Sequence, residues 1–281
     1  MASGPVGTLA AGVCFLLAAL AHARRLRVGA WLGAAGAAIL SGALAARGLR
    51  ADYWPLTGTY EFALSFALGT ALAALALDPG RGRSAPTSSR AARPGLRPSG
   101  REIEGAHAVQ AATMALAAAL LAYARLGLPA FKRAIQPLSP ALDSVWLPLH
   151  VGAAALGYGA LAMAGAAGLV WLARDSARGG AERLMERAVA AGYPLLTLSV
   201  LLGMVWAQAA WGRYWGWDLK ETWTLITWLV YTLYWHLRRR ARWRGRRLAW
   251  LALAGMGAVL FTFLGAGWLA RAVGLESLHL F

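Results

Sequence analysis

The sequence predicts an all-α polytopic membrane protein with about eight transmembrane helices and both termini on the extracytoplasmic side. Hydrophobic residues make up 59% of the chain, and its mean hydropathy is +0.50. Apolar runs long enough to cross a bilayer recur along the whole chain. The connections between these runs are alternately rich and poor in basic residues, as expected for a chain that crosses a membrane repeatedly.

Each apolar run is interpreted as one spanning helix, because roughly 17–25 apolar residues are needed to cross the hydrocarbon core. The fourth run is rich in alanine and the seventh is short, so their ends are the least sharply defined. No water-soluble domain remains once the runs are removed. The expected helices are 5–21, 28–46, 60–77, 108–128, 146–173, 193–210, 223–237 and 248–270.

The basic residues set the expected orientation. Twenty of the 28 Lys and Arg residues lie in the first, third, fifth and seventh connections, and the other eight lie in the alternate connections and near the C-terminus. Because basic residues are enriched in cytoplasmic loops, the rich connections are expected inside and both termini outside. The same argument places the sixth connection, which holds residues 211–223, on the extracytoplasmic side.

The net charge of +16 arises mainly in the inner connections and requires no nucleic-acid partner. Anionic lipid headgroups of the cytoplasmic leaflet are the expected partner of the arginines between 238 and 247. A single cysteine, Cys14, excludes an intrachain disulfide, a CxxC redox pair and a CxxCH heme-attachment site. The chain divides into a three-helix membrane region (1–77), a cytoplasmic linker rich in Arg, Pro and Ser (78–106), and a five-helix region (107–281).

Residues 211–223, WGRYWGWDLKETW, form the most distinctive segment of the chain. Seven of the fourteen tryptophans lie between 206 and 235, so the enrichment is local. Indole faces stack on planar rings and basic side chains meet an anionic edge, so the mixture predicts a site for a flat apolar ligand with a charged rim. The candidate binding residues are Trp211, Arg213, Tyr214, Trp215, Trp217, Asp218, Lys220, Glu221 and Trp223.

An aromatic belt at the membrane surface would also explain these aromatic residues. A belt does not require Asp218, Lys220 and Glu221 within the cluster, and their presence favours a binding site. Asp218 and Glu221 are three residues apart, and with basic neighbours they are more typical of charge-paired scaffolding than of an acid–base pair. The sequence contains no Ser/His/Asp arrangement outside the helices, no HExxH, no Walker loop and no cysteine ligand set.

Two histidines are expected on the same side of the membrane as this segment. His150 lies near the outer end of the fifth expected helix, and His279 follows the eighth. Two neutral imidazoles above an aromatic platform could bind heme iron from both faces, with Arg213, Lys220 and Arg271 meeting the propionates. The alternative is that each histidine caps a helix end at the interface, and the coincidence of two on this side favours the heme site.

The remaining histidines lie toward the cytoplasmic side. His236, near the end of the seventh expected helix, is either an inner ligand of heme iron or a side chain that snorkels to the headgroups. His22 ends the first expected helix on the same side and could pair with His236. His107, beside Glu104 at a helix start, is expected to be a solvated interfacial residue.

Residues 211–238, WGRYWGWDLKETWTLITWLVYTLYWHLR, resemble the tryptophan-rich WWD signature of heme-handling membrane proteins. Within that superfamily the chain is similar to the CcsA (ResC) branch of cytochrome c biogenesis. Further matching blocks are WPLTGTYEF (54–62), PLSPALDSVWLPLHVG (137–152) and FLGAGWLARAVGLESLHLF (263–281). Two positions depart from the family pattern: Leu219 replaces the usual proline, and the residues around His279 lack the usual polar, aromatic tail.

The resemblance implies that His150 and His279 are axial ligands of heme b on the outer face, that 211–223 cradles the porphyrin, and that His236 belongs to an inner heme site. Region 107–281 would then be the heme-handling core. Heme would pass to the CxxCH thiols of an apocytochrome c, with a CcsB (ResB)-type membrane partner, as part of a cytochrome c synthase (heme lyase) in a bacterial plasma membrane.

Two alternative functions remain. One is a heme exporter or chaperone of the CcmC type, but the entry to the third helix and the expected eight helices favour the CcsA branch. The other is a b-type transmembrane electron-transfer cytochrome. That function requires pairs of histidines facing one another within the bundle, and no expected helix carries two.

Overall fold

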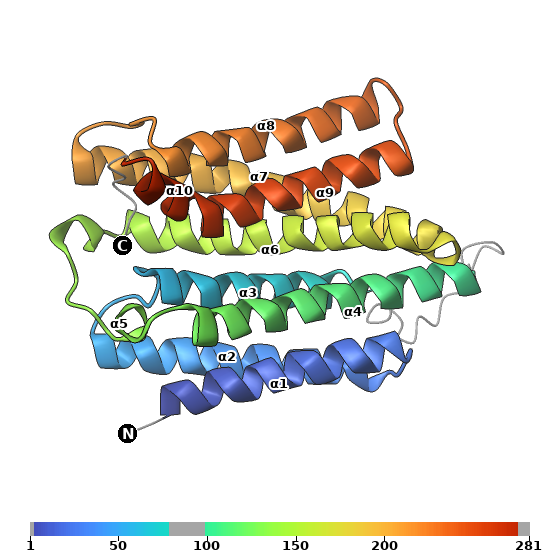
Figure 1. Ribbon diagram of the computed structural model, residues 1–281, viewed down its shortest axis with the longest axis horizontal. Coiled ribbons are helices and arrows are strands. Elements are labelled where there is room, and N and C mark those ends of the chain that lie inside the picture. The colour runs from blue at the N-terminus through green and yellow to red at the C-terminus, as the bar shows by residue number, and fades with distance from the viewer. Residues whose placement is uncertain (1–2, 79–98, 275–281) are drawn as a thin grey trace, which may run out of the picture.

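The computed structural model describes residues 3–78 and 99–274, and every regular element within these ranges is helical. The long helices run side by side along one axis (Figure 1). Short elements are α5 (Ala130–Arg133), α10 (Ala266–Ala272), the 3-10 turns η3 (Pro140–Leu142) and η4 (Asp175–Ala177), and the π-helical turns η2 (Tyr123–Gly127) and η5 (Phe261–Gly265). The long helices are α1 (Ser3–Ala23), α2 (Val28–Ala51), α3 (Thr59–Ala76), α4 (Gly100–Ala122), α6 (Trp146–Ala173), α7 (Arg178–Trp211), α8 (Leu219–Arg239) and α9 (Arg246–Leu260).

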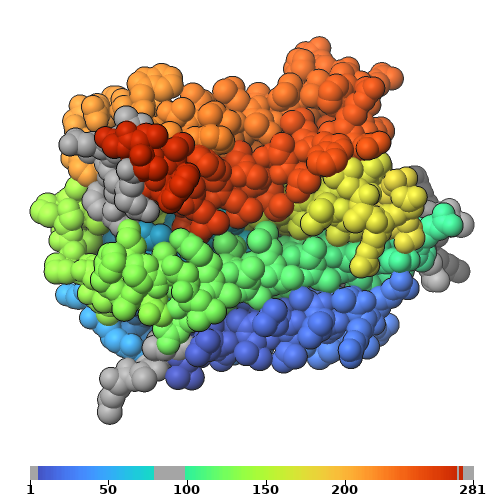
Figure 2. All heavy atoms as spheres, in the orientation of Figure 1, coloured from blue at the N-terminus to red at the C-terminus, as the bar shows by residue number. Residues whose placement is uncertain are grey.

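The bundle consists of two groups of helices, α1–α4 and α6–α9, and α6 lies between the groups against α3, α7 and α9 (Figure 1). The same view with all atoms shows α9 and α10 covering one half of the visible face and α1 and α4 the other (Figure 2). Glycines allow the closest approach between the groups. A Cβ on Gly159 of α6 would collide with the backbone of Gly69 and Thr70 in α3, so α3 and α6 are in backbone contact.

Within residues 3–78 and 99–274, seven helices are long and apolar enough to cross a membrane, and the chain is therefore an integral membrane protein with several spans. The sequence predicts eight spanning helices, one more than these seven. Residues 223–237 are helical, within α8, but α8 is not among the seven. Its first turn carries Lys220 and Glu221 and its last carries Arg238 and Arg239, so its apolar stretch is short. In Figure 1, α8 nevertheless runs along the length of the bundle beside α7 and α9.

Two helices begin earlier than the hydropathy predicts. Helix α4 begins at Gly100, inside the expected linker, because Ser99 and Glu102 form a capping box at its N-terminus. Helix α7 begins at Arg178 and continues through Pro194. Its first part is too polar for a membrane run, but Leu184, Met185 and neighbouring apolar residues of one face are buried, which stabilises the extension by packing.

Candidate functional site

The predicted binding segment lies at one end of the bundle, where α7 ends, α8 begins and α6 starts (Figure 1). Beneath it is a small apolar cluster, separate from the main core, made by buried Leu147, Val151 and Trp206. Trp211 packs against this cluster. The first turns of α6 and the last turns of α7 therefore form a packed base for the segment.

The imidazole of His150 is held in one orientation by α7. Its Nδ1 lies 2.8 Å from the backbone oxygen of Ser199, and the Ser199 hydroxyl donates to the backbone oxygen of His150 at 3.2 Å. A carbonyl oxygen can only accept, so Nδ1 carries a proton, and when the ring is neutral the lone pair is on Nε2. Metal-binding histidines commonly have this arrangement, because the second hydrogen bond fixes the tautomer and the ring orientation.

Two further residues that the sequence did not single out shape the His150 environment. The indole of Trp206 is parallel to the imidazole, with an interplanar angle of 9° and ring centroids 6.2 Å apart. Trp206 is itself fixed, since its Nε1 donates to the backbone oxygen of Ala141 at 3.1 Å. A Cβ on Gly203 would lie 2.8 Å from Nδ1 and Cε1 of His150, so a hydrogen at this position is required for the ring to fit. The four-residue spacing of Ser199 and Gly203, which places both on one face of α7, is a sequence pattern that could have indicated these two residues, and Trp206 begins the tryptophan-rich stretch.

The turn between α7 and α8 is built by backbone conformation and capping. Gly212 ends α7 with φ of 72°, and Trp217 has φ of 57°. Asp218 is the N-cap of α8, and its Oδ1 accepts from the backbone N–H of Glu221 at 2.8 Å. The Glu221 carboxylate accepts from the N–H of Gly216 at 2.7 Å and from that of Asp218 at 3.3 Å. Both carboxylates therefore act as scaffolding that holds backbone N–H groups.

This turn leaves aromatic surface exposed outside the bundle. The side chains of Trp217 and Tyr214 are 70% and 57% exposed. A non-glycine residue with positive φ is uncommon, and at Trp217 this conformation accompanies a ring that points outward. The Trp215 ring meets the Trp217 ring edge-on with centroids 5.9 Å apart. The Trp215 Nε1–H is buried and has no acceptor among the described residues, as expected where a ligand supplies one.

The other predicted ligand-binding residues lie in different settings. Arg213 is exposed and its guanidinium lies over Gly216, whereas Lys220 is half-buried at the start of α8. Trp223 packs against Phe261 at 4.1 Å between ring centroids, on the bundle side of the segment. His279 lies outside the described residues, and nothing is described of the Arg271 side chain.

The histidines toward the opposite end are arranged differently from the expectation. His236 is exposed on α8. His22 is buried and contacts His107, with 3.4 Å between the two Nδ1 atoms, so its partner is His107 and not His236. His107, expected to be a solvated interfacial residue, is half-buried, because α4 packs against α1 and the His107 ring contacts His22.

These residues fit heme. The neutral imidazole of His150 offers an axial nitrogen, exposed indole and phenol rings offer flat apolar surface, and Arg213 and the Trp215 N–H can meet anionic or hydrogen-bond-accepting groups at the edge of a ring. The structure thus defines a polytopic helical membrane protein with an aromatic turn beside one oriented histidine at the end of its bundle.

The comparisons with known proteins define the family. A sequence model described as cytochrome C assembly protein matches residues 99–273, and the chain belongs to this family. The cytochrome c biogenesis protein CcsA of Synechococcus elongatus is 31% identical over 88% of this chain and 86% of its own length. The CcsA protein of Synechococcus sp. strain JA-3-3Ab is 32% identical over 83% of this chain and 80% of its own length. The CcsA protein of Chlamydomonas reinhardtii is 36% identical over 57% of this chain and 48% of its own length. The resemblance to the CcsA branch is confirmed, and the chain is a membrane protein of cytochrome c biogenesis.

Proposed function

We propose that the chain binds heme b at the 211–223 end of the bundle and presents it on the extracytoplasmic face of a bacterial plasma membrane. A CcsB (ResB)-type membrane protein would act with it, and an apocytochrome c would receive the heme. The observation that carries the proposal is the His150 imidazole, which Ser199 holds through Nδ1 near a turn of exposed aromatic rings.

Heme is the substrate of this reaction and supplies two vinyl groups. Each CxxCH thiol adds across one vinyl double bond, forming a C–S bond and a C–H bond with no leaving group. The residues of the protein would contribute by holding the heme in a fixed position. His150 holds the iron from one side, the Trp217 and Tyr214 rings support the porphyrin, and Arg213 meets the propionates, so that the vinyl edge faces the incoming thiols.

The proposed orientation agrees with the arrangement of charge along the bundle. At the end opposite to the 211–223 turn, a cavity of about 520 Å³ is lined by Glu186, Trp235 and four arginines: Arg238, Arg239, Arg242 and Arg244. A basic surface of this kind suits the anionic headgroups of the cytoplasmic leaflet. His236 is exposed on α8, next in sequence to Trp235, which lines this cavity, so an inner heme bound to it would lie at the surface of α8.

The test is the absorption spectrum of the purified protein compared with those of His150→Ala and His279→Ala. A six-coordinate low-spin heme that is lost in either variant and recovers when imidazole is added would support the outer site. Transfer to a CxxCH peptide would then separate a synthase component from an exporter that only delivers heme. Heme retained unchanged in both variants would contradict the outer site and direct attention to His236.

A further inference from the structure

A second basic pocket, outside the heme site, opens at the same end of the bundle as the 211–223 turn. It lies among α2, α3, η2 and the segment around α5, and its volume is about 330 Å³. None of its described lining residues is acidic. The lining consists of four arginines (Arg47, Arg50, Arg125 and Arg133) and of Thr8, Ala43, Tyr60, Leu64, Ala130, Ala134 and Ile135.

The charge of this pocket is unusual for its position. Only eight of the 28 Lys and Arg residues lie in the connections poor in basic residues and near the C-terminus, and four of those eight line this one pocket. These four arginines come from two connections that are far apart in sequence, at 47–50 and 125–133. Positive charge that is scarce at this end is thus gathered in one place by the fold.

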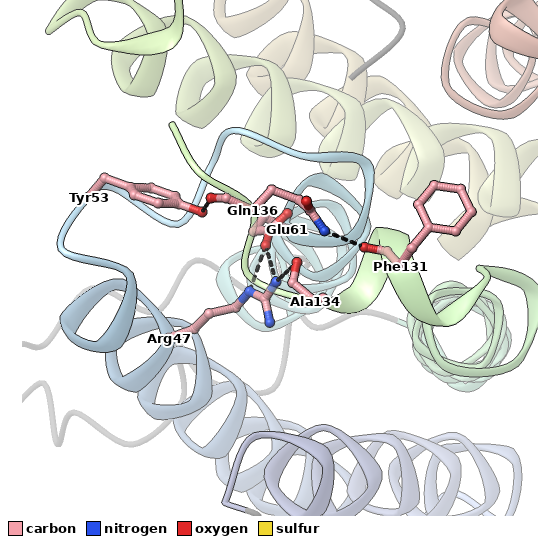
Figure 3. Close-up of polar contacts among 6 residues, drawn as sticks. All are labelled: Arg47, Tyr53, Glu61, Phe131, Ala134 and Gln136. Carbon is pink, nitrogen blue, oxygen red and sulfur yellow. Dashed lines mark hydrogen bonds and ion pairs between the residues drawn. The ribbon is translucent and has the colours of Figure 1, made fainter. Parts of the chain in front are cut away.

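One of the arginines is structural. The Nε of Arg47 donates to Glu61 at 2.6 Å and its Nη2 donates to the backbone oxygen of Ala134 at 3.1 Å (Figure 3). Its guanidinium lies 4.8 Å from the centre of the Tyr60 ring. The Glu61 side chain is buried beside it and balances its charge. Arg47 therefore joins α2 to α3 and to the α5 segment, and Arg50, Arg125 and Arg133 give the pocket its net positive charge.

The wall formed by the α5 segment is also held in place. Tyr53 donates to the backbone oxygen of Gln136 at 2.8 Å, and the Gln136 amide donates to the backbone oxygen of Phe131 at 2.8 Å (Figure 3). Arg133 Nη1 donates to the backbone oxygen of Arg125 at 2.6 Å. The guanidinium of Arg133 is thereby positioned before any ligand arrives, which lowers the entropic cost of binding an anion.

The chemistry of the lining selects a phosphate group. Guanidinium groups bind phosphate oxygens through two parallel N–H donors, and several of them around one small cavity suit a single compact anion better than an extended one. Exposed apolar residues are the sequence neighbours of lining residues: Leu49, beside Arg50, is 86% exposed, Leu126, beside Arg125, 83%, and Phe131, beside Ala130, 64%. An anion at the end of a membrane bundle with an apolar surface beside it matches a headgroup whose acyl chains remain in the lipid.

We infer that this pocket binds a phosphate group, either that of an anionic phospholipid in the leaflet at this end of the bundle or free phosphate. Arg50, Arg125 and Arg133 are the binding residues, and Arg47 positions the walls. The inference concerns a site separate from the heme-binding turn, so it is tested on heme-free protein and stands or falls independently of the proposed function.

The experiment is native mass spectrometry of delipidated protein titrated with phosphatidylglycerol or phosphatidylcholine, together with thermal unfolding in phosphate or chloride at equal ionic strength. We expect preferential binding of phosphatidylglycerol, reduced at least tenfold in Arg125→Gln/Arg133→Gln. Lys132→Gln removes one charge beside Arg133 without altering the lining, and it should bind as the wild type does. Stabilisation by inorganic phosphate, lost in the same double variant, would instead identify free phosphate as the source.

Arg50→Gln is the second variant, because Arg50 is exposed and its replacement leaves the Arg133 to Arg125 hydrogen bond intact. It should weaken binding several-fold while its unfolding temperature stays at that of the wild type. Equal binding of both lipids without an effect of phosphate would overturn the inference, as would wild-type affinity in both the double variant and Arg50→Gln.

Discussion

At the scale of single residues, the orientation of His150 depends on neighbours that have no ligand chemistry of their own. Ser199 fixes the tautomer of the imidazole, and Gly203 makes room for the ring against α7. A histidine ligand is useful only if its ring is held where the metal arrives, because a freely rotating ring must lose entropy on binding.

Gly203→Ala tests this dependence. The new Cβ would lie 2.8 Å from the imidazole, so the ring must move and its hydrogen bond to Ser199 must lengthen. We expect heme affinity to fall about tenfold, in the range typical of residues that orient a metal ligand. Gly152→Ala is the matched control, because its Cβ would meet nothing within 4 Å, and its heme spectrum should be unchanged. A Gly203→Ala protein with wild-type heme content would contradict this account of His150.

At the scale of elements, the start of α8 is decided by its cap. Asp218 and Glu221 satisfy backbone N–H groups that would otherwise lack partners at the helix N-terminus. The 211–223 segment, with its exposed rings, therefore has a defined end, and its two carboxylates hold the backbone of the turn.

Substitutions at Asp218 distinguish its role as the N-cap acceptor of α8 from the role of its negative charge. Asp218→Ala removes the N-cap acceptor and should destabilise the turn by about 1 kcal/mol, with loss of heme binding. Asp218→Asn keeps an acceptor without the charge, since asparagine caps about as well as aspartate. We expect Asp218→Asn to retain both the unfolding temperature and the heme spectrum of the wild type. If it behaves as Asp218→Ala does, the negative charge itself is required.

The geometry at the start of α8 also bears on Leu219, which replaces the proline usual in the family pattern. Leu219 is the first residue of α8, and proline is favoured at the first position of a helix. Asp218 has φ of −67° and ψ of 168°, the extended conformation that proline imposes on the residue before it. We expect Leu219→Pro to be neutral or to stabilise the protein by about 0.5–1 kcal/mol with unchanged heme binding. A marked fall in unfolding temperature would show that the turn differs from that of its proline-containing relatives.

At the scale of the whole molecule, connections rich and poor in basic residues alternate because successive helices run in opposite directions. Successive long helices run in opposite directions along the bundle axis (Figure 1). One end of the bundle therefore holds the C-terminal ends of α2 and α7 and the N-terminal ends of α6 and α8. Helix α8 completes this alternation despite its lower hydropathy, because Thr227, Tyr231 and Tyr234 are buried against the bundle.

Labelling of single cysteines tests the orientation. In a Cys14→Ala background, Pro137→Cys and Ser176→Cys place thiols at exposed positions beyond the two ends of α6. We expect a membrane-impermeant maleimide to label position 137 in intact cells and position 176 only after lysis. Labelling in the reverse order would place the 211–223 turn in the cytoplasm and rule out the proposed presentation of heme on the outer face.

The sequence by itself determined the membrane class, most helix positions and the family resemblance, and it predicts a binding role for residues 211–223. Hydropathy, basic residues in loops, helix caps and a dense aromatic motif are local properties, and a chain displays them before it folds. The early starts of α4 and α7 and the weak hydropathy of α8 were missed or misjudged, because capping and packing extend a helix beyond the apolar run that predicts it.

Only the tertiary structure decided which residues meet. Ser199 reaches His150 across 49 positions, His22 contacts His107 across 85, and Arg47 bonds to the backbone of Ala134 across 87. Such pairs depend on the register and rotation of helices that pack together, and these follow from the fit of glycines and side chains between helices. No single segment contains that information, so the orientation of His150 and the gathering of four arginines in one pocket could be known only from the fold.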